Sequence, residues 1–176
     1  MNELLPLIYL SVLLAILAGS AIFIFRQVFK TRKTETNLSK LQKKLKQEQG
    51  TSLEYYQLGS IYLDKKLFVQ AAKLFQKALK AGKKEDPENL ALIHNALGYS
   101  YFAQEQYDMA IREYKEAVKY KADYITALNN LANVYERKKL TAQALEIYEQ
   151  TLTHEPNNSV AKRRAESLRK RLVTSN

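Results

Sequence analysis

The chain has 176 residues, enough for one modest domain and an appendage, and it contains no cysteine, which excludes disulfides, thiol catalysis and thiolate metal sites. The net charge is +10. Residues 26–50 hold eight basic and two acidic residues and residues 160–176 hold six basic and one acidic, so residues 51–159 are neutral overall, unlike the basic body that is typical of a nucleic-acid-binding protein.

An uncharged segment comes first in the chain. Residues 4–25 read LLPLIYLSVLLAILAGSAIFIF, 22 residues without a charge, and about 20 helical residues cross a hydrocarbon core of about 30 Å. The alternative is a secretory signal peptide, because LAGSA at 17–21 has the small residues of a cleavage site. The apolar run is too long for that and follows Glu3 rather than positive charge. We therefore predict a retained transmembrane helix over residues 4–26.

Basic residues follow the span, at Arg26, Lys30, Arg32 and Lys33. The positive-inside tendency keeps such a cluster on the side of synthesis, so we expect the rest of the chain on the cytoplasmic face, or on the stromal face in a plastid. The same cluster can pair with anionic lipid at the membrane surface, which contributes about 1 kcal/mol per residue.

Residues 27–50 predict a basic juxtamembrane linker helix that ends at Gly50. Leu38, Leu41 and Leu45 are spaced i, i+3, i+7 and form one narrow apolar stripe. The stripe favours a helix that packs on the first turn of the following domain. The alternative is an interfacial helix that lies on the membrane.

Three segments of the body align with one another. They begin at Leu58, Leu97 and Leu131, 39 and 34 residues apart, and a period near 34 residues predicts stacked helical hairpins. Small residues recur where the two helices of a hairpin approach, and large residues fill the adjoining layer. The small residues are Gly59, Gly98 and Ala132 on the first helices and Ala71, Ala110 and Ala144 on the second, and the large ones are Tyr62, Tyr101 and Tyr135, then Phe75, Tyr114 and Tyr148.

This order of large residue, Leu-Gly, Tyr, Ala, Phe and Ala, closed by Pro156 in the third copy, resembles the tetratricopeptide repeat. The resemblance covers residues 52–158. It implies an all-α solenoid of three repeats, at 51–90, 91–124 and 125–158. The first copy departs through an insertion, AGKKEDPEN at 81–89, which we interpret as a longer loop that carries the N-cap of the next helix.

Residues 159–173 predict a basic capping helix at the end of the solenoid, because stacked repeats need an end helix with one polar face. Its inward residues are expected to be Val160, Ala161, Ala165, Leu168 and Leu172. Its Lys and Arg residues form a solvated outer face or, alternatively, a second contact for anionic lipid or an acidic protein.

The sequence predicts no enzyme. It lacks a Gly-rich phosphate loop, clustered metal ligands and a nucleophile beside a base, so we expect no catalytic residue, cofactor, metal or small-molecule substrate. His94 occupies the large-residue position of the second repeat, which predicts a packed core histidine. His154 falls on a terminal turn, where it is expected to be solvated.

In the tetratricopeptide family the first helices line a concave groove that holds a partner's peptide or helix. The family's groove positions fall on Leu53, Tyr56, Ser60, Leu63, Leu92, Asn95, Tyr99, Phe102, Asn129, Asn133 and Arg137. An apolar and aromatic lining suits an amphipathic or extended segment, and asparagines can pair with its backbone. The alternative is that Leu53, Tyr56 and Leu92 are covered internally by the Leu38–Leu45 helix.

Chaperone co-factors of this family clamp a terminal carboxylate with Lys, Arg and Asn. The matching positions here hold Tyr56, Ser60, Ala96, Thr126 and Asn130, of which four cannot do this, so chaperone-tail binding is disfavoured.

The anchor and first repeat together, IYLSVLLAILAGSAIFIFRQVF at 8–29 and YYQLGSIYLDKKLFVQAAKLFQKAL at 55–79, resemble the membrane-anchored photosystem I assembly proteins of plastids and cyanobacteria. The resemblance implies a non-catalytic scaffold that crosses the thylakoid membrane once, with residues 1–3 as a short lumenal tail and the repeats on the stromal or cytoplasmic side. It also implies photosystem I subunits or other assembly factors as partners, besides membrane lipid. One alternative is a bacterial inner-membrane scaffold for an unrelated envelope complex, and another is an import receptor for presequences.

Overall fold

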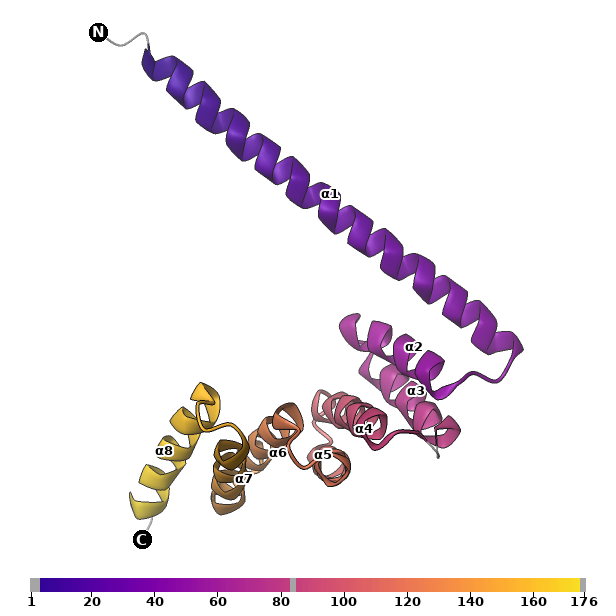
Figure 1. The fold of residues 1–176 in the computed structure, drawn as a ribbon, viewed down its shortest axis with the longest axis vertical. Coiled ribbons are helices and arrows are strands. Elements are labelled where there is room, and N and C mark those ends of the chain that lie inside the picture. The colour runs from indigo at the N-terminus through magenta and orange to yellow at the C-terminus, as the bar shows by residue number, and fades with distance from the viewer. Residues whose placement is uncertain (1–3, 83–84, 175–176) are drawn as a thin grey trace. The chain divides into compact units, whose positions relative to one another are not determined.

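The computed structural model describes residues 4–82 and 85–174, so the predicted tail at 1–3 and two residues of the predicted insertion, Lys83 and Lys84, lie outside the described residues. The described part forms eight α-helices and no strand, which confirms the all-α class. It divides into two compact units, residues 1–47 and 48–176 (Figure 1). The helices are α1 (Leu4–Gln47), α2 (Ser52–Asp64), α3 (Phe68–Ala81), α4 (Pro87–Phe102), α5 (Tyr107–Tyr120), α6 (Ile125–Arg137), α7 (Thr141–His154) and α8 (Ser159–Thr174).

The first unit is one helix of 44 residues, α1. By length and composition it is apolar enough to cross a membrane. The sequence predicts a separate linker helix after Arg26, but α1 continues without a break to Gln47 (Figure 1). The reason is local: residues 20–49 contain neither Gly nor Pro, so nothing in this stretch breaks the helix.

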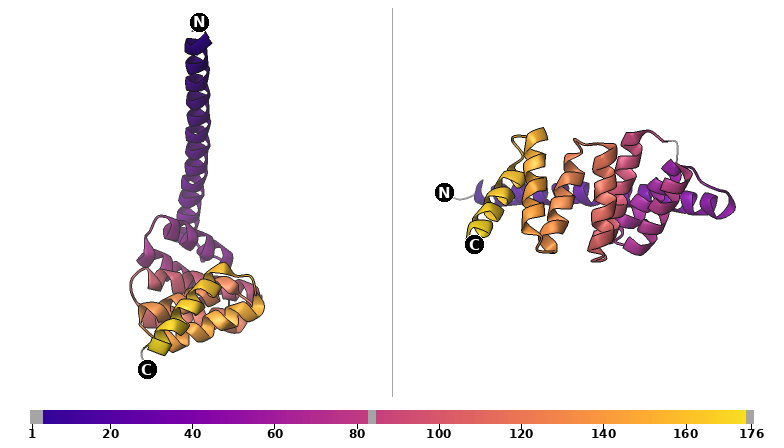
Figure 2. Two further views of the ribbon diagram at one scale, coloured as in Figure 1. Left: turned by 90° about the vertical axis from the view of Figure 1, so that its left-hand side faces the viewer. Right: turned by 90° about the horizontal axis from the view of Figure 1, so that it is seen from below.

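The second unit is a row of helices that pack on their neighbours in chain order, as Figure 2 shows. Helices α2/α3, α4/α5 and α6/α7 form three hairpins, and α8 packs on α7. The buried side chains of the hairpins and of α8 join in one apolar cluster. This arrangement confirms the predicted stack of three hairpins with an end helix.

The three hairpins close through the same backbone turn. Lys66, Glu105 and Lys139 have φ of 60°, 59° and 60°, the left-handed region that non-glycine residues occupy at a cost of about 1 kcal/mol. In each turn the next amide donates to the carbonyl oxygen of a tyrosine five residues earlier, at 2.8–3.0 Å. The turns recur 39 and 34 residues apart, as the sequence repeats do.

Within the hairpins, small residues face large ones as the sequence predicts. A Cβ atom added at Gly59 would lie 2.7 Å from Cε1 of Phe75, and one added at Gly98 would lie 2.8 Å from Cδ1 of Tyr114. Both rings are buried. The first helix therefore approaches the second too closely in these two copies for any larger residue to fit without a shift.

Two first helices begin with side-chain caps. Thr51 and Glu54 form a capping box at the start of α2, each side chain bonding to the other's backbone N–H at 3.3 and 3.0 Å. Asp86 caps α4 by accepting from the Glu88 amide at 3.0 Å, with Pro87 in the first turn. The predicted N-cap within the inserted loop is thus confirmed.

Helix α8 is the last helix of the row. Its predicted inner face is confirmed only in part. Ala161, Ala165 and Leu168 are buried, but Val160 is 44% exposed, so its predicted inward position is wrong. Val160 lies in the first turn of the helix, outside the stripe that meets α7. Two basic residues of α8 bond to acidic residues of the third repeat: Arg164 lies 3.6 Å from Glu136, and Arg169 lies 2.7 Å from Glu149.

Candidate peptide groove

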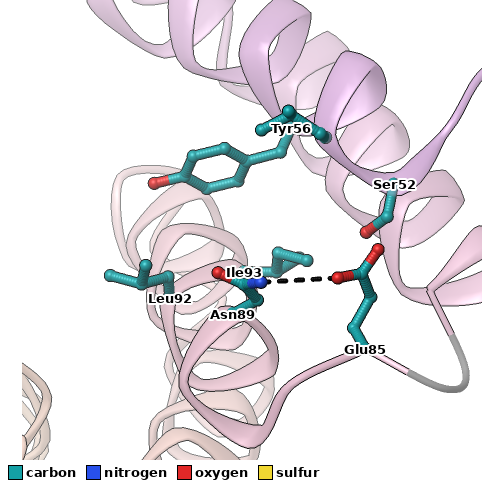
Figure 3. A pocket seen from close by; sticks show the side chains of 7 residues that line it. Ser52, Tyr56, Glu85, Asn89, Leu92 and Ile93 are labelled. Atoms are coloured by element: carbon teal, nitrogen blue, oxygen red, sulfur yellow. Dashed lines mark hydrogen bonds between the residues drawn. The ribbon is translucent and has the colours of Figure 1, made fainter.

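A first cavity lies between the N-terminal halves of α2 and α4. It has a volume of about 320 Å³ and is lined by Ser52, Leu53, Tyr56, Glu85, Asn89, Leu92 and Ile93. Figure 3 shows its apolar side, formed by Tyr56, Leu92 and Ile93, facing a polar rim at which Asn89 donates to Glu85 across 3.4 Å. The cavity therefore offers an apolar floor with one carboxylate at its edge.

A second cavity adjoins the first and runs along α2, α4 and α6. It has a volume of about 630 Å³ and shares Tyr56 and Leu92 with the first, so the two form one groove. Its lining adds Ser60, Leu63, Asp64, Lys66, Phe68, Asn95, Ala96, Tyr99, Tyr124, Thr126 and Asn130. Seven of the predicted groove residues thus line the two cavities: Leu53, Tyr56, Ser60, Leu63, Leu92, Asn95 and Tyr99.

The groove exposes large apolar side chains over its first two repeats. Leu53 is 61% exposed, Leu92 40% and Tyr99 43%. Apolar side chains that gather in a depression mark binding surfaces more often than single exposed ones do. This part of the groove can therefore accept an apolar side chain.

A chain of amide and phenol groups crosses the groove at the second and third repeats. Asn130 Nδ2 donates to Asn95 Oδ1 at 3.0 Å, and Asn95 Nδ2 donates to the Tyr124 hydroxyl at 3.4 Å. Burial raises the pKa of Tyr124, so its phenol stays neutral. Such groups offer both donors and acceptors to a peptide backbone.

The sequence reasoning missed Tyr124 as a groove residue and considered Asn130 only as a clamp position. Tyr124 immediately precedes α6 and reaches the groove from the end of a loop. A helix-periodicity argument places only residues inside helices, so it could not find Tyr124. Asn130, by contrast, lay one residue from a predicted position.

Other predicted groove residues do not line these cavities. They are Phe102, Asn129, Asn133 and Arg137. Phe102 packs in an aromatic row, 6.4 Å from Tyr99 and 5.9 Å from Tyr107 between ring centroids. Asn129 has a buried Oδ1 without a hydrogen-bond partner in the described part of the chain. Asn133 and Arg137 are exposed at the C-terminal half of α6.

The two histidines lie away from the groove. His94 packs in the repeats as predicted, with 13% of its side chain exposed and its ring stacked on Tyr120 at 5.5 Å, and its Nδ1 also lies 2.8 Å from Glu113 Oε2. Burial acts to raise the pKa of Glu113, but hydrogen bonds from His94 and Arg112 together lower it below its usual value. His154 is exposed at the end of α7, as predicted.

The predicted membrane-surface residues Arg26, Lys30, Arg32 and Lys33 lie on α1, directly after its apolar part. All are exposed.

Three regions of the chain match family models. Residues 98–139 match a TPR repeat model, and residues 55–81 and 127–159 match tetratricopeptide repeat models. These matches bear out the repeats that the sequence predicts.

Several curated proteins are similar over most of the chain. The "uncharacterized protein ycf37" of Cyanophora paradoxa is 43% identical over 81% of this chain and 82% of its own length. The "tetratricopeptide repeat domain-containing protein PYG7, chloroplastic" of Arabidopsis thaliana is 34% identical over 93% of this chain and 54% of its own length. Among solved structures, MamA superposes with a TM-score of 0.71 at 22% identity, covering 80% of this chain and 81% of that one, and this shows the fold alone.

Proposed function

Because this chain belongs to the ycf37 family of tetratricopeptide-repeat proteins, we propose that it is a non-catalytic scaffold, tethered to the thylakoid membrane, that assists the assembly or stabilisation of photosystem I. Tetratricopeptide repeats are protein-interaction modules, and this chain has three of them. The observation that carries the proposal is the open apolar groove on α2, α4 and α6 in a chain whose first helix is apolar enough to cross a membrane.

The plastid assignment draws on two lines of support. The PYG7 relative is chloroplastic by name. The anchor and first repeat also resemble the membrane-anchored photosystem I assembly proteins. Both favour photosystem I over the alternative of a bacterial envelope complex.

Tethering supplies the physical advantage of the scaffold. A repeat domain confined to a membrane surface meets membrane-bound clients at a raised effective concentration, so a weak groove can suffice. The basic residues after the apolar part of α1 support an orientation with the repeats on the stromal or cytoplasmic side, since positive charge tends to stay on the side of synthesis.

The groove would hold an exposed segment of an incoming subunit or of another assembly factor. An apolar side chain of that segment would enter the cavity beside Tyr56 and Leu92. Its backbone would pair with the amide groups of Asn95 and Asn130. Burial of the apolar side chain supplies most of the affinity, and the amides set the direction of the segment.

Removal of the anchor tests the tether. A chain without residues 1–25 should keep its repeats folded yet fail to support photosystem I accumulation, measured as oxidisable reaction centre per chlorophyll in a strain that carries only this form. Full accumulation with the soluble form would refute the tether.

Substitution of the groove tests the client site. The double change Leu92→Ala and Tyr99→Ala should lower photosystem I accumulation and remove photosystem I subunits from a pull-down of detergent-solubilised membranes. The matched control changes two apolar residues that lie outside the groove and are similarly exposed, Val69→Ala and Val160→Ala, and should behave as wild type. Recovery of envelope machinery or precursor proteins instead would favour the other functions.

A further inference from the structure

Helix α3 carries a row of lysines on one face. Lys73, Lys77 and Lys80 are spaced i, i+4, i+7, so they share one side of the helix, and α3 contains no acidic residue. All three are exposed. Lys77 lies 5.7 Å from the centroid of the Tyr55 ring. Among the residues that the structure describes, Lys73 and Lys80 form no ion pair.

A third cavity lies beside this row, and none of its lining residues belongs to the groove. It has a volume of about 680 Å³ and lies between α3, α4 and α5. Its apolar lining comes from Leu79, Leu97 and the stacked rings of His94 and Tyr120. Together with the lysine row, we name it the α3–α5 surface.

The two carboxylates of the cavity lining are paired, while one of its cations is not. Glu113 is buried, and its two oxygens are taken by His94 and Arg112, at 2.8 Å each. Glu116 is paired with Lys119 at 3.3 Å. Lys80 forms no ion pair with a described residue, so the edge on the α3 side offers a cation beside an apolar and aromatic floor.

We propose that the α3–α5 surface binds an acidic segment of a partner protein. One apolar or aromatic side chain of the segment enters the cavity against Leu79 and Tyr120, and flanking carboxylates pair with the lysine row. Lys80 lies seven positions after Lys73, a rise of about 10 Å along the helix. Three residues of a polyproline II segment cover about the same length, and every third side chain of such a segment points to the same side. Acidic residues three apart in a polyproline II segment therefore match the row.

Charge complementarity identifies the occupant. A second copy of this surface would bring two lysine rows together, and like charges oppose that contact. The groove, in contrast, has only Asp64, Lys66 and Glu85 as charged lining. The α3–α5 surface goes beyond the proposed function, since a chain with two separate surfaces can hold two protein segments at once.

The test uses the full chain in a non-ionic detergent and a fluorescent peptide with blocked ends. The peptide has a central phenylalanine and glutamates spaced three residues apart, and its matched control has glutamine in place of glutamate. Binding is followed by fluorescence anisotropy at low ionic strength, where exposed charges are least screened. The acidic peptide should bind and the glutamine peptide should bind at least about tenfold more weakly.

Charge reversal locates the site. The variant Lys73→Glu with Lys80→Glu should weaken binding of the acidic peptide by about tenfold, because two attractions become repulsions. The control Lys139→Glu with Arg163→Glu makes the same change in net charge at exposed positions of other elements and should weaken it by less than about twofold. The groove variant Leu92→Ala with Tyr99→Ala should bind this peptide as wild type does.

Four results would overturn the inference. Equal losses in the two charge variants would mean non-specific attraction. Equal affinity for the glutamine peptide would mean that charge plays no part. Vesicles of phosphatidylglycerol and phosphatidylcholine that bind the wild type but not Lys73→Glu/Lys80→Glu, with no binding of the peptide, would mean that the occupant is a lipid surface. Loss of peptide binding in the groove variant alone would mean that the acidic peptide binds in the groove and not at the α3–α5 surface.

Discussion

The replacement of Gly98 by alanine tests the close helix contact on which the repeats depend. The new Cβ would lie 2.8 Å from both Cδ1 and Cε1 of Tyr114, whose ring is 1% exposed and has no open side into which to move. Overpacking a core costs about 1–3 kcal/mol, while a Gly-to-Ala change inside a helix gains about 1 kcal/mol. We expect a net loss of about 1 kcal/mol, which lowers the melting temperature by about 3–6 °C in a unit of this size.

Urea unfolding of residues 48–176, a compact unit by itself, followed by circular dichroism, measures this loss. The control is the double change Gly98→Ala with Tyr114→Leu, in which the smaller neighbour makes room for the new methyl group. In that background Gly98→Ala should no longer cost stability, so the two changes should couple by about 1 kcal/mol or more. A higher unfolding midpoint for Gly98→Ala alone would refute the reasoning, because it would mean that α4 and α5 can separate freely.

Three more substitutions test a cap, a turn and a buried carboxylate in the same unit. Thr51→Ala removes the capping box with Glu54 and should lower the free energy of unfolding by about 1 kcal/mol; an unchanged midpoint in urea would contradict this. Lys139→Gly relieves a left-handed backbone and should raise that free energy by up to about 1 kcal/mol, and a lower value would show that the turn is unstrained. Because the pKa of folded Glu113 lies below its usual 4.5, its stabilisation is present above the unfolded-state pKa and is lost as pH falls through the folded value. Urea titrations from neutral to acid pH should show a steeper acid loss in wild type than in Glu113→Gln, and equal slopes would speak against it.

The repeats could be predicted from the sequence because their signal is local. Gly98 and Tyr114 are separated by 16 residues, and the same small and large pairing recurs in other copies, so one spacing rule places both helices of a hairpin. The Asp86-Pro87 cap is readable for the same reason, since a cap depends on the residues next to it.

The groove was only partly predictable. Family positions on the first helices found Tyr56, Leu92 and Asn95, since the direction of a side chain on a helix follows from its number. They gave Asn129, whereas its neighbour Asn130 lines the cavity, because which of two adjacent residues reaches the groove depends on the small rotation of α6 against α4. That rotation is a property of the packing between hairpins, which no local spacing encodes.

The α3–α5 surface could not be predicted from the net charge of the sequence. Residues 51–159 are neutral as a sum, yet α3 holds only basic residues among its charges, while α7 holds Glu146 and Glu149 without a lysine or arginine. The net charge of residues 51–159 does not show that basic and acidic residues lie on different helices. Only the stacking of the hairpins shows that the lysines of α3 stand beside an apolar cavity.

The continuity of α1 bears on how the basic segment can meet lipid. If residues 4–26 cross the bilayer, a helix that runs on without a break carries residues 27–47 along the same axis, so they cannot also lie flat on the membrane as an interfacial helix. Lys33 is then about 10 Å beyond Arg26 and Lys46 about 30 Å beyond it, along a helix normal to the bilayer. Since charges are screened over about 8 Å at physiological ionic strength, only the residues from Arg26 to Lys33 can pair with lipid headgroups. The lysines from Lys40 onward lie too far from the headgroups and can contact only protein or solvent. This argues against the hypothesis that the segment is an interfacial helix.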